Sequence, residues 1–304
     1  MTRKKAVIVG AVESTYIALD LIAQSSDWEL AALVTLPLAN ASRHSDFVDL
    51  RDMAAKAGGR VIEAANSNDP DIVQQISDIN PDIMFVIGWS QICGPAFMAA
   101  AGGNVVGYHP APLPQMRGRA AIPWTILLNQ SITASTLFWI DEGVDSGPIL
   151  AQKFIHIAPD ETATTLYARH LNALGEIFTE SLGAIAAGTA RRDEQDHQYA
   201  SWTTKRTPKD GLVNWNDPVE DVWRLIRATT RPYPGAYTVW DDEKLVLWSA
   251  APWPEGKRYN AMPGQVLAID GSGIAVQCGD GALWIDDWSL GGDKKLRLHV
   301  KLGA

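Results

Sequence analysis

A histidine, a run of prolines and two arginines lie together in the stretch VVGYHPAPLPQMRGRAAIPW, residues 105–124. The apolar opening predicts a buried strand that ends at His109. The prolines that follow fix the backbone and remove amide donors, so we expect a stiff loop. Arg117 and Arg119 flank Gly118 and could clamp an anionic ligand. His109 is therefore either a structural residue at a bend or part of the rim of an active site.

A second group of polar side chains follows another apolar run, STLFWI at 135–140. Asp141, Glu142 and Asp145 lie after it on a turn interrupted by glycine, and such acidic turns are commonly just solvated. If the two strands are neighbours, however, Asp145 could meet His109 at the edge of the sheet. A carboxylate beside an imidazole fixes its tautomer and makes it a better base, which suits a proton shuttle.

Short apolar runs alternate with helical patterns over the first 110 residues. Strands that are apolar throughout and separated by helices predict an α/β fold with a mainly parallel, Rossmann-like sheet covered on both faces. Ligands bind such sheets beyond the carboxyl ends of the strands. We expect strands at 6–10, 29–35, 60–64, 82–88, 104–109 and 135–140, and helices at 14–25, 46–58, 70–79, 93–102 and about 162–188.

The composition changes near residue 205, because eight of the twelve tryptophans lie between Trp202 and Trp288. Short strand-like runs punctuated by glycine and aspartate are typical there of a small antiparallel barrel. Trp215, Trp223 and Trp240 are expected in its core rather than in ligand contacts. The domains are therefore predicted as a catalytic domain at 1–188, a linker at 189–205 and an OB-like domain at 206–304.

The net charge and the number of cysteines limit the possible partners of the protein and the compartment in which it works. The 304 residues carry a formal net charge of −9, which opposes binding of nucleic acid through overall charge. The two cysteines have neither a disulfide framework nor metal-ligand spacing, so no metal is expected. No signal peptide or membrane span is visible, and we expect a soluble, cytoplasmic protein. A homodimer is compatible with the sequence, which does not fix the oligomeric state.

The stretch HPAPLPQMRGRAAIPW, followed by GVDSGPIL, resembles the active-site region of formyltransferases that use 10-formyltetrahydrofolate. This group includes methionyl-tRNA formyltransferase and the sugar-nucleotide N-formyltransferases. Residues 205–215 (KRTPKDGLVNW) and 226–240 (IRATTRPYPGAYTVW) are similar to the C-terminal domain of the tRNA and aminoarabinose enzymes. The resemblance covers nearly the whole chain, and it implies formyl transfer to an amine without a metal.

The resemblance also implies roles for individual residues. His109 would be the general acid/base, and Asp145 would orient it. Two loops and the proline stretch would line the folate pocket through Ile87, Gly88, Trp89, Ser90, Leu113, Pro114, Ile140, Asp141, Glu142, Gly143 and Val144.

One position departs from the family pattern. The third catalytic residue of the family is an asparagine two positions before the histidine, and this chain has Gly107 there. Losing an oxyanion-hole donor typically costs about 2.7–4 kcal/mol. The candidates for a substitute are Gln91, Ser90 and a bound water. Asn104 ranks last, because strand alternation places it on the opposite face from Gly107.

The acceptor is predicted from charge. The tRNA-directed relatives carry a basic insertion after the second strand, whereas residues 37–50 here contain one arginine against two aspartates. A small anionic acceptor therefore fits better, and we predict a nucleotide-linked amino sugar. The residues expected to bind it are Met116, Gly118, Trp124 and the arginines Arg117, Arg119, Arg206, Arg227 and Arg231, although each arginine could instead be an ordinary surface residue. Gly10 is a further candidate, but a tight turn is the preferred role there.

Three other functions stay open. Methionyl-tRNA formyltransferase is one of them. A formyltetrahydrofolate deformylase is another, although the C-terminal domain argues against it. The third is a folate-binding protein with reduced catalysis, which is suggested only by Gly107.

Overall fold

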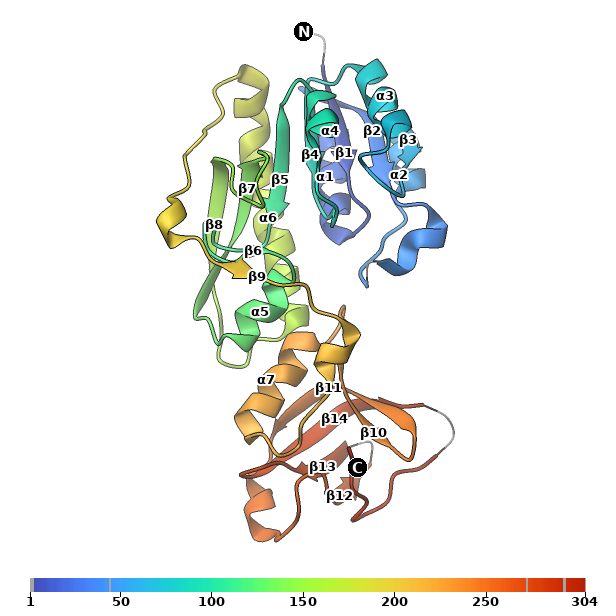
Figure 1. Cartoon of the computed structure of the whole chain (residues 1–304), viewed down its shortest axis with the longest axis vertical. Coiled ribbons are helices and arrows are strands. Elements are labelled where there is room, and N and C mark those ends of the chain that lie inside the picture. Colours follow the sequence, from blue (N-terminus) through green and yellow to red (C-terminus); the bar gives the residue numbers. More distant parts are fainter. Residues whose placement is uncertain (1–2, 44, 272, 292–293, 304) are drawn as a thin grey trace. The chain divides into compact units, whose positions relative to one another are not determined.

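The computed structural model describes residues 3–43, 45–271, 273–291 and 294–303, and the chain divides into two compact units (Figure 1). Unit 1 consists of residues 1–121, 132–156 and 168–204. Unit 2 consists of residues 122–131, 157–167 and 205–304. Each unit has its own hydrophobic core.

Unit 1 is built on a seven-stranded sheet in the order β3-β2-β1-β4-β5-β7-β8. The first five strands in this order are parallel, and β7 and β8 are antiparallel to their neighbours. The parallel sheet predicted from the apolar runs is therefore confirmed. The strands are β1 (Lys4–Val9), β2 (Trp28–Thr35), β3 (Arg60–Glu63), β4 (Ile83–Val86), β5 (Val105–His109), β7 (Ile132–Trp139) and β8 (Ile149–His156).

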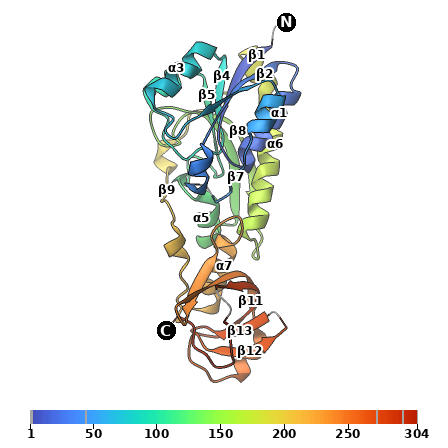
Figure 2. The ribbon, with the colours of Figure 1, turned by 90° about the vertical axis from the view of Figure 1, so that its right-hand side faces the viewer.

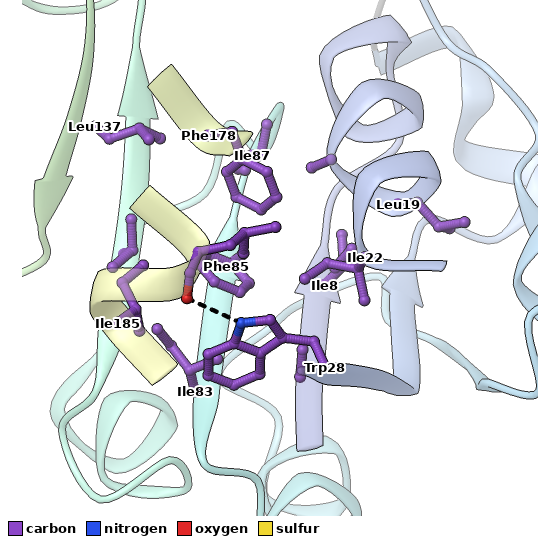
Figure 3. Close-up of a cluster of buried hydrophobic side chains, with 14 of the residues drawn as sticks. Ile8, Leu19, Ile22, Trp28, Ile83, Phe85, Ile87, Leu137, Phe178 and Ile185 are labelled. Atoms are coloured by element: carbon purple, nitrogen blue, oxygen red, sulfur yellow. Dashed lines mark hydrogen bonds between the residues drawn. The ribbon is translucent and has the colours of Figure 1, made fainter. Parts of the chain in front are cut away.

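Helices cover both faces of this sheet, with α1 (Glu13–Gln24) and α6 (Ala163–Ala187) on one face and α3 (Pro70–Ile79) on the other (Figure 2). The face under α1 and α6 holds a cluster of aromatic and aliphatic side chains (Figure 3). Phe85 packs edge-on against Trp28 and Phe178, and the Trp28 indole donates to the carbonyl of Leu182 at 3.1 Å. Burial of these apolar side chains stabilises the packing of α1 and α6 on the sheet.

Two predicted elements differ from the structure. The helix expected at 46–58 is reduced to α2 (Arg51–Lys56), because Phe47 bridges to Val12 and the Val48 amide donates to Ala11. The helix expected at 93–102 is only the short α4 (Pro95–Ala99). The edge strand β8 was not predicted.

The predicted linker is built into unit 1 up to residue 204. Ile149 and Asp193 exchange two backbone hydrogen bonds, at 2.8 and 3.0 Å. Further along, β9 (Trp202–Thr203) pairs in parallel with β6 (Arg117–Gly118). We call residues 193–203 the strap, since they are fastened to unit 1 at both ends.

Unit 2 contains an antiparallel sheet in the order β10-β11-β14-β13-β12. Residues 299–303 bond to both edges of this sheet, since the His299 amide donates to Val266 and the Gly303 amide donates to Val239. Trp215 is buried in the core, and Trp223 and Trp240 pack against it, as predicted. The elements of this unit include α7 (Val219–Thr229), β10 (Ala236–Trp240), β11 (Glu243–Pro252), β12 (Val266–Asp270), β13 (Gly273–Gln277), β14 (Ala282–Leu290) and most of α5 (Ala121–Leu127).

No helix among the described residues is both long enough and apolar enough to cross a membrane.

Candidate functional site

His109 ends β5, and it meets Asp145 by a longer route than the sequence suggests. The strands β5 and β7 are neighbours, but they run antiparallel, with His109 opposite Thr136 and Val106 opposite Trp139. The loop after β7 therefore starts near the beginning of β5 and must return along it. This return brings Asp145 Oδ2 to 3.8 Å from His109 Nδ1.

The hydrogen bonds of His109 define which nitrogen can exchange a proton. Nε2 lies 2.8 Å from the carbonyl oxygen of Met116. A carbonyl only accepts, so Nε2 carries a hydrogen and donates it. Nδ1 is then the basic nitrogen of the neutral ring, and it faces the Asp145 carboxylate across a gap too long for a direct hydrogen bond. A proton arriving on Nδ1 would create an imidazolium that Asp145 stabilises.

Asp145 is held by two different segments. Its Oδ2 accepts a hydrogen bond from the Gly118 amide at 2.7 Å, so the residue between the two arginines helps to aim the carboxylate. Its backbone is in the left-handed region, with φ of 50°. The strap residue Gln195 donates through Nε2 to the carbonyls of Asp145 and Gly147, at 2.9 and 2.7 Å. Side chain and backbone of Asp145 are therefore both fixed.

Arg117 does not have the free guanidinium that the sequence suggests. The side chain is only 3% exposed. Its Nη2 donates to Gln195 Oε1 at 2.6 Å and lies 3.0 Å from His197 Nδ1. The fork of Arg117 therefore anchors the strap, and its role as a ligand clamp stays a prediction. Arg119 is exposed, and among the described residues its bonds are those of its backbone to Thr203.

The space beside Gly107 is filled. A Cβ atom on Gly107 would lie 2.8 Å from Cζ of Phe138 and 3.0 Å from Cγ1 of Ile140. Phe138 is the cross-strand partner of Gly107, and it is 4% exposed. An asparagine at 107 would therefore require the Phe138 ring and the Ile140 side chain to shift.

The loops after β1 and β4 pack tightly against each other. A Cβ on Gly10 would overlap the Ile87 carbonyl oxygen, so the close approach of the two loops requires glycine at this position. The Ile87 carbonyl accepts from Thr15 Oγ1 and the Ile87 amide donates to Val9. Both backbone groups of Ile87 are thus used within the protein. Gly88 has φ of 74°, which turns the chain toward Trp89.

The other predicted folate contacts fall into two groups. Leu113 is buried, and both of its backbone groups are bonded, to Ala111 and to Gln152. The turn at 141–144 is exposed, and it is shaped by Asp141, which accepts from the Gly143 amide and the Ser146 hydroxyl. This turn has surface to offer a ligand.

Gln91 is engaged elsewhere, although it was a candidate to replace the asparagine. Its Oε1 accepts from the Ser67 amide at 3.0 Å, and its Nε2 donates to the Ala65 carbonyl at 3.1 Å. Both ends of the amide are therefore used by the loop after β3.

The remaining candidates for acceptor binding belong to unit 2. Arg206 lies over the Trp124 ring at 5.3 Å, and burial lowers the pKa of its guanidinium. Arg231 stacks on Trp248 at 4.3 Å and pairs with Asp287 at 2.7 Å. Arg227 is buried and donates to the Glu161 carbonyl, so it is structural.

Two residues of the site were missed by sequence reasoning, namely Gln195 and Phe138. Gln195 lies in a polar stretch typical of a linker, and its contacts depend on a fold-back that periodicity does not encode. Phe138 could have been found, since pairing of the two strands places its ring against Gly107. Within the described part of the chain, no three His, Cys, Asp or Glu side chains form a metal-binding group.

Comparisons with known proteins show the family to which the chain belongs. The family model for the formyl transferase domain matches residues 13–182, and the model for the formyl transferase C-terminal domain matches residues 205–301. The methionyl-tRNA formyltransferase of Geobacter metallireducens is 32% identical over 272 residues, which cover 88% of this chain and 85% of that protein.

Solved structures share the fold. HypX from Aquifex aeolicus superposes with a TM-score of 0.70 at 19% identity, over 93% of this chain and 44% of HypX, so this chain spans less than half of that protein. An N-formyltransferase from Helicobacter canadensis, solved with folinic acid and dTDP-3-aminofucose, gives a TM-score of 0.66 at 15% identity, over 93% of this chain and 98% of that one. Both family models match in order, and the first covers the strands and loops that hold His109 and Asp145. The chain is therefore a formyltransferase, a member of the formyl transferase family.

Proposed function

We propose that the protein transfers the formyl group of 10-formyltetrahydrofolate to the amine of a nucleotide-linked amino sugar, with His109 as the general acid/base. One observation carries this proposal: the basic nitrogen of His109 faces Asp145 at 3.8 Å, while the other nitrogen is bonded to Met116. The ring is thus oriented for proton transfer at one atom.

The proposed reaction requires the His109 imidazole to move one proton. The acceptor amine attacks the formyl carbon, the bond from that carbon to N10 of the folate breaks, and a proton passes from the amine to N10. His109 Nδ1 takes this proton and returns it, and Asp145 stabilises the charged ring in between. The rigid loop from His109 to Met116 keeps Nδ1 in place during both steps.

The folate is proposed to lie along the loop after β4 and the exposed turn at 141–144. The family match supports this assignment, as do the solved relatives that are described with tetrahydrofolate or a formyl-tetrahydrofolate. The acceptor class rests on charge: the net charge of −9 disfavours a polyanion, and neighbours in fold are named as sugar N-formyltransferases. The exposed Arg119 of unit 1 is proposed as an acceptor contact.

A formylation assay tests the proposal. The protein is incubated with 10-formyltetrahydrofolate and a panel of nucleotide-linked amino sugars, and tetrahydrofolate release and product mass are measured together. A product heavier than its acceptor by one formyl group is expected. Formate release that needs no amine would instead show a deformylase. Folate binding without turnover on any acceptor would show a binding protein.

The variant His109→Gln tests the assigned base. Glutamine can still donate to the Met116 carbonyl but cannot accept and return a proton, so kcat should fall by about 10²–10⁴-fold while the folate Kd changes little. Asn172→Gln, an exposed change on α6, is the control. We attribute a change of up to about threefold in kcat to altered packing around residue 109. A His109→Gln enzyme with kcat within that range of the parent would therefore refute the role of His109 as general acid/base.

Methionyl-tRNA is the second candidate acceptor, because the curated relatives aligned over most of this chain are methionyl-tRNA formyltransferases. Formylation of charged initiator tRNA, measured beside the sugar panel, separates the two. Activity on tRNA alone would replace the sugar acceptor and leave the roles of His109 and Asp145 unchanged.

A further inference from the structure

The site needs a hydrogen-bond donor that residue 107 cannot supply. An asparagine there would overlap the Phe138 ring and Ile140, whose atoms lie 2.8 to 3.0 Å from the position of a Cβ. The Phe138 and Ile140 side chains thus form an apolar wall beside Gly107, where the family pattern is polar. If the protein transfers formyl groups, another group must stabilise the oxygen that becomes negatively charged.

Most side-chain donors near this wall are already used. Thr136 Oγ1, opposite His109, donates to the Ala111 carbonyl at 2.7 Å. Gln152 donates to Leu113, and Gln91 donates to Ala65. Even the Gly118 amide is taken by Asp145. These groups would each have to break an existing bond before they could bind substrate.

Trp89 is different. Its Nε1 atom is buried and has no hydrogen-bond partner among the residues that the structure describes. A buried donor left unpaired costs about 1–3 kcal/mol, so an orphan of this kind calls for a function or a missing ligand. An indole N–H can only donate, which is the capacity that the site lacks.

Trp89 also lies on the correct face. Val86 is the register partner of Gly107, and Trp89 follows it by three residues, just beyond the end of β4. The indole packs against the buried cluster that contains Val86 and Val105, and Ile140 packs against the same cluster. Strand alternation puts Val105, Gly107 and His109 on one face of β5. Trp89 therefore shares the face of the missing asparagine.

We infer that the indole Nε1–H of Trp89 is the oxyanion donor that replaces the family asparagine, and that Phe138 has closed the original position. This inference rests on the proposed function. In dry, apolar surroundings a donor gives up no bound water when it binds, so its bond to a developing negative charge is strong. Trp89 is part-exposed as a residue, and the substrate must displace the atoms that cover Nε1 to reach it.

The test removes the N–H and keeps the ring. Trp89→Phe should lower kcat by about 10²–10³-fold, whereas loss of the bond to the bound folate should raise the Kd for 5-formyltetrahydrofolate by no more than about tenfold. Trp139→Phe is the matched control, because that indole donates to the Arg191 carbonyl and packs in the cluster on the other face of the sheet. The control should lower Tm and leave kcat unchanged. If Trp89→Phe does not fold, benzothienylalanine at position 89 keeps the indole shape without the N–H.

A second readout does not depend on turnover. In ¹⁵N-labelled protein, the indole resonance that disappears in Trp89→Phe belongs to Trp89, and saturating 5-formyltetrahydrofolate should shift it downfield. An unchanged resonance, or a kcat that falls in Ser90→Ala but not in Trp89→Phe, would overturn the inference. Absence of any folate binding or of any formylated product in the parent would instead refute the proposed function.

Discussion

At the scale of single residues, burial sets the protonation state of His170, a histidine on α6. His170 on α6 is 2% exposed, and its Nδ1 lies 2.9 Å from Ser135 Oγ, which in turn contacts the Tyr108 hydroxyl. Burial, with smaller contributions from His109 and Arg169, lowers the pKa of His170 from 6.5 to about 3. The folded protein thus keeps this ring neutral where the unfolded chain would charge it.

The lowered pKa of His170 predicts that the folded protein loses stability in acid. Below pH 6.5 the unfolded chain takes up a proton that folded His170 refuses, so stability present above that pH is lost as pH falls toward 3. The loss is at most about 1.4 kcal/mol per pH unit. In His170→Asn the free energy of unfolding, measured with urea at about pH 7, 6 and 5, should fall less steeply than in the parent. Parallel curves for the variant and the parent would contradict this. His156→Asn, at an exposed histidine, should behave as the parent.

Gly107 and Phe138 make a second prediction at this scale. Gly107→Asn should lower the free energy of unfolding by about 1–3 kcal/mol, because the new side chain overpacks against Phe138. Adding Phe138→Ala should recover part of this loss, giving a coupling energy in a double-mutant cycle. Gly183→Asn on α6 is the control, since Gly183 is exposed, nothing lies within 4 Å of its Cβ position and its φ is not in the left-handed region. Additive effects of the two substitutions would show that the ring does not exclude the side chain.

At the scale of elements, the strap is the feature that holds the carboxylate. Gln195 is 5% exposed and joins Arg117 to the carbonyls of Asp145 and Gly147. Gln195→Ala leaves the Arg117 guanidinium and both carbonyls without this partner. The turn that carries Asp145 should therefore loosen.

The expected result is a fall in kcat of at least about tenfold, with a smaller change in KM, because the positioning of Asp145 and not folate binding is disturbed. The pH dependence of kcat should move as well, since the Asp145–His109 distance changes. Gln198→Ala is the control, because that side chain donates to the neighbouring Asp196 and not to the turn that carries Asp145 within the described residues. A Gln195→Ala enzyme that loses Tm but keeps both kcat and its pH profile would make the strap purely structural.

The elements that could be predicted from sequence are those with strong local patterns. The apolar runs predicted the parallel strands, and the stripe containing Leu174 and Phe178 predicted α6. The strand β8 was missed, because its antiparallel position at the sheet edge leaves Lys153 and Phe154 exposed and gives no continuous apolar run. The shortened α2 was missed as well, because its first residues are drawn into contacts with the loop after β1, which are long-range.

At the scale of the whole molecule, charge is the property that most constrains the acceptor. The chain carries 26 basic and 35 acidic side chains. An enzyme that binds several phosphates of a nucleic acid loses about 10³–10⁵ in affinity between 50 and 200 mM salt. A nucleotide-linked sugar presents only a diphosphate, so its KM should rise by less than about tenfold over the same range. A steeper rise, measured by formylation at several salt concentrations, would favour tRNA.

The close approach of Phe138 to Gly107 has a consequence for the history of the family. An asparagine at 107 and a phenylalanine at 138 compete for the same space, so the two positions cannot change independently. A lineage that changes one position first passes through a protein that is either overpacked or has a cavity between the two strands. Among relatives, glycine at the position of 107 should therefore accompany an aromatic residue at the position of 138, and asparagine should accompany a smaller one. A single pair of alignment columns would then separate members with the original donor from those that have moved it to another loop.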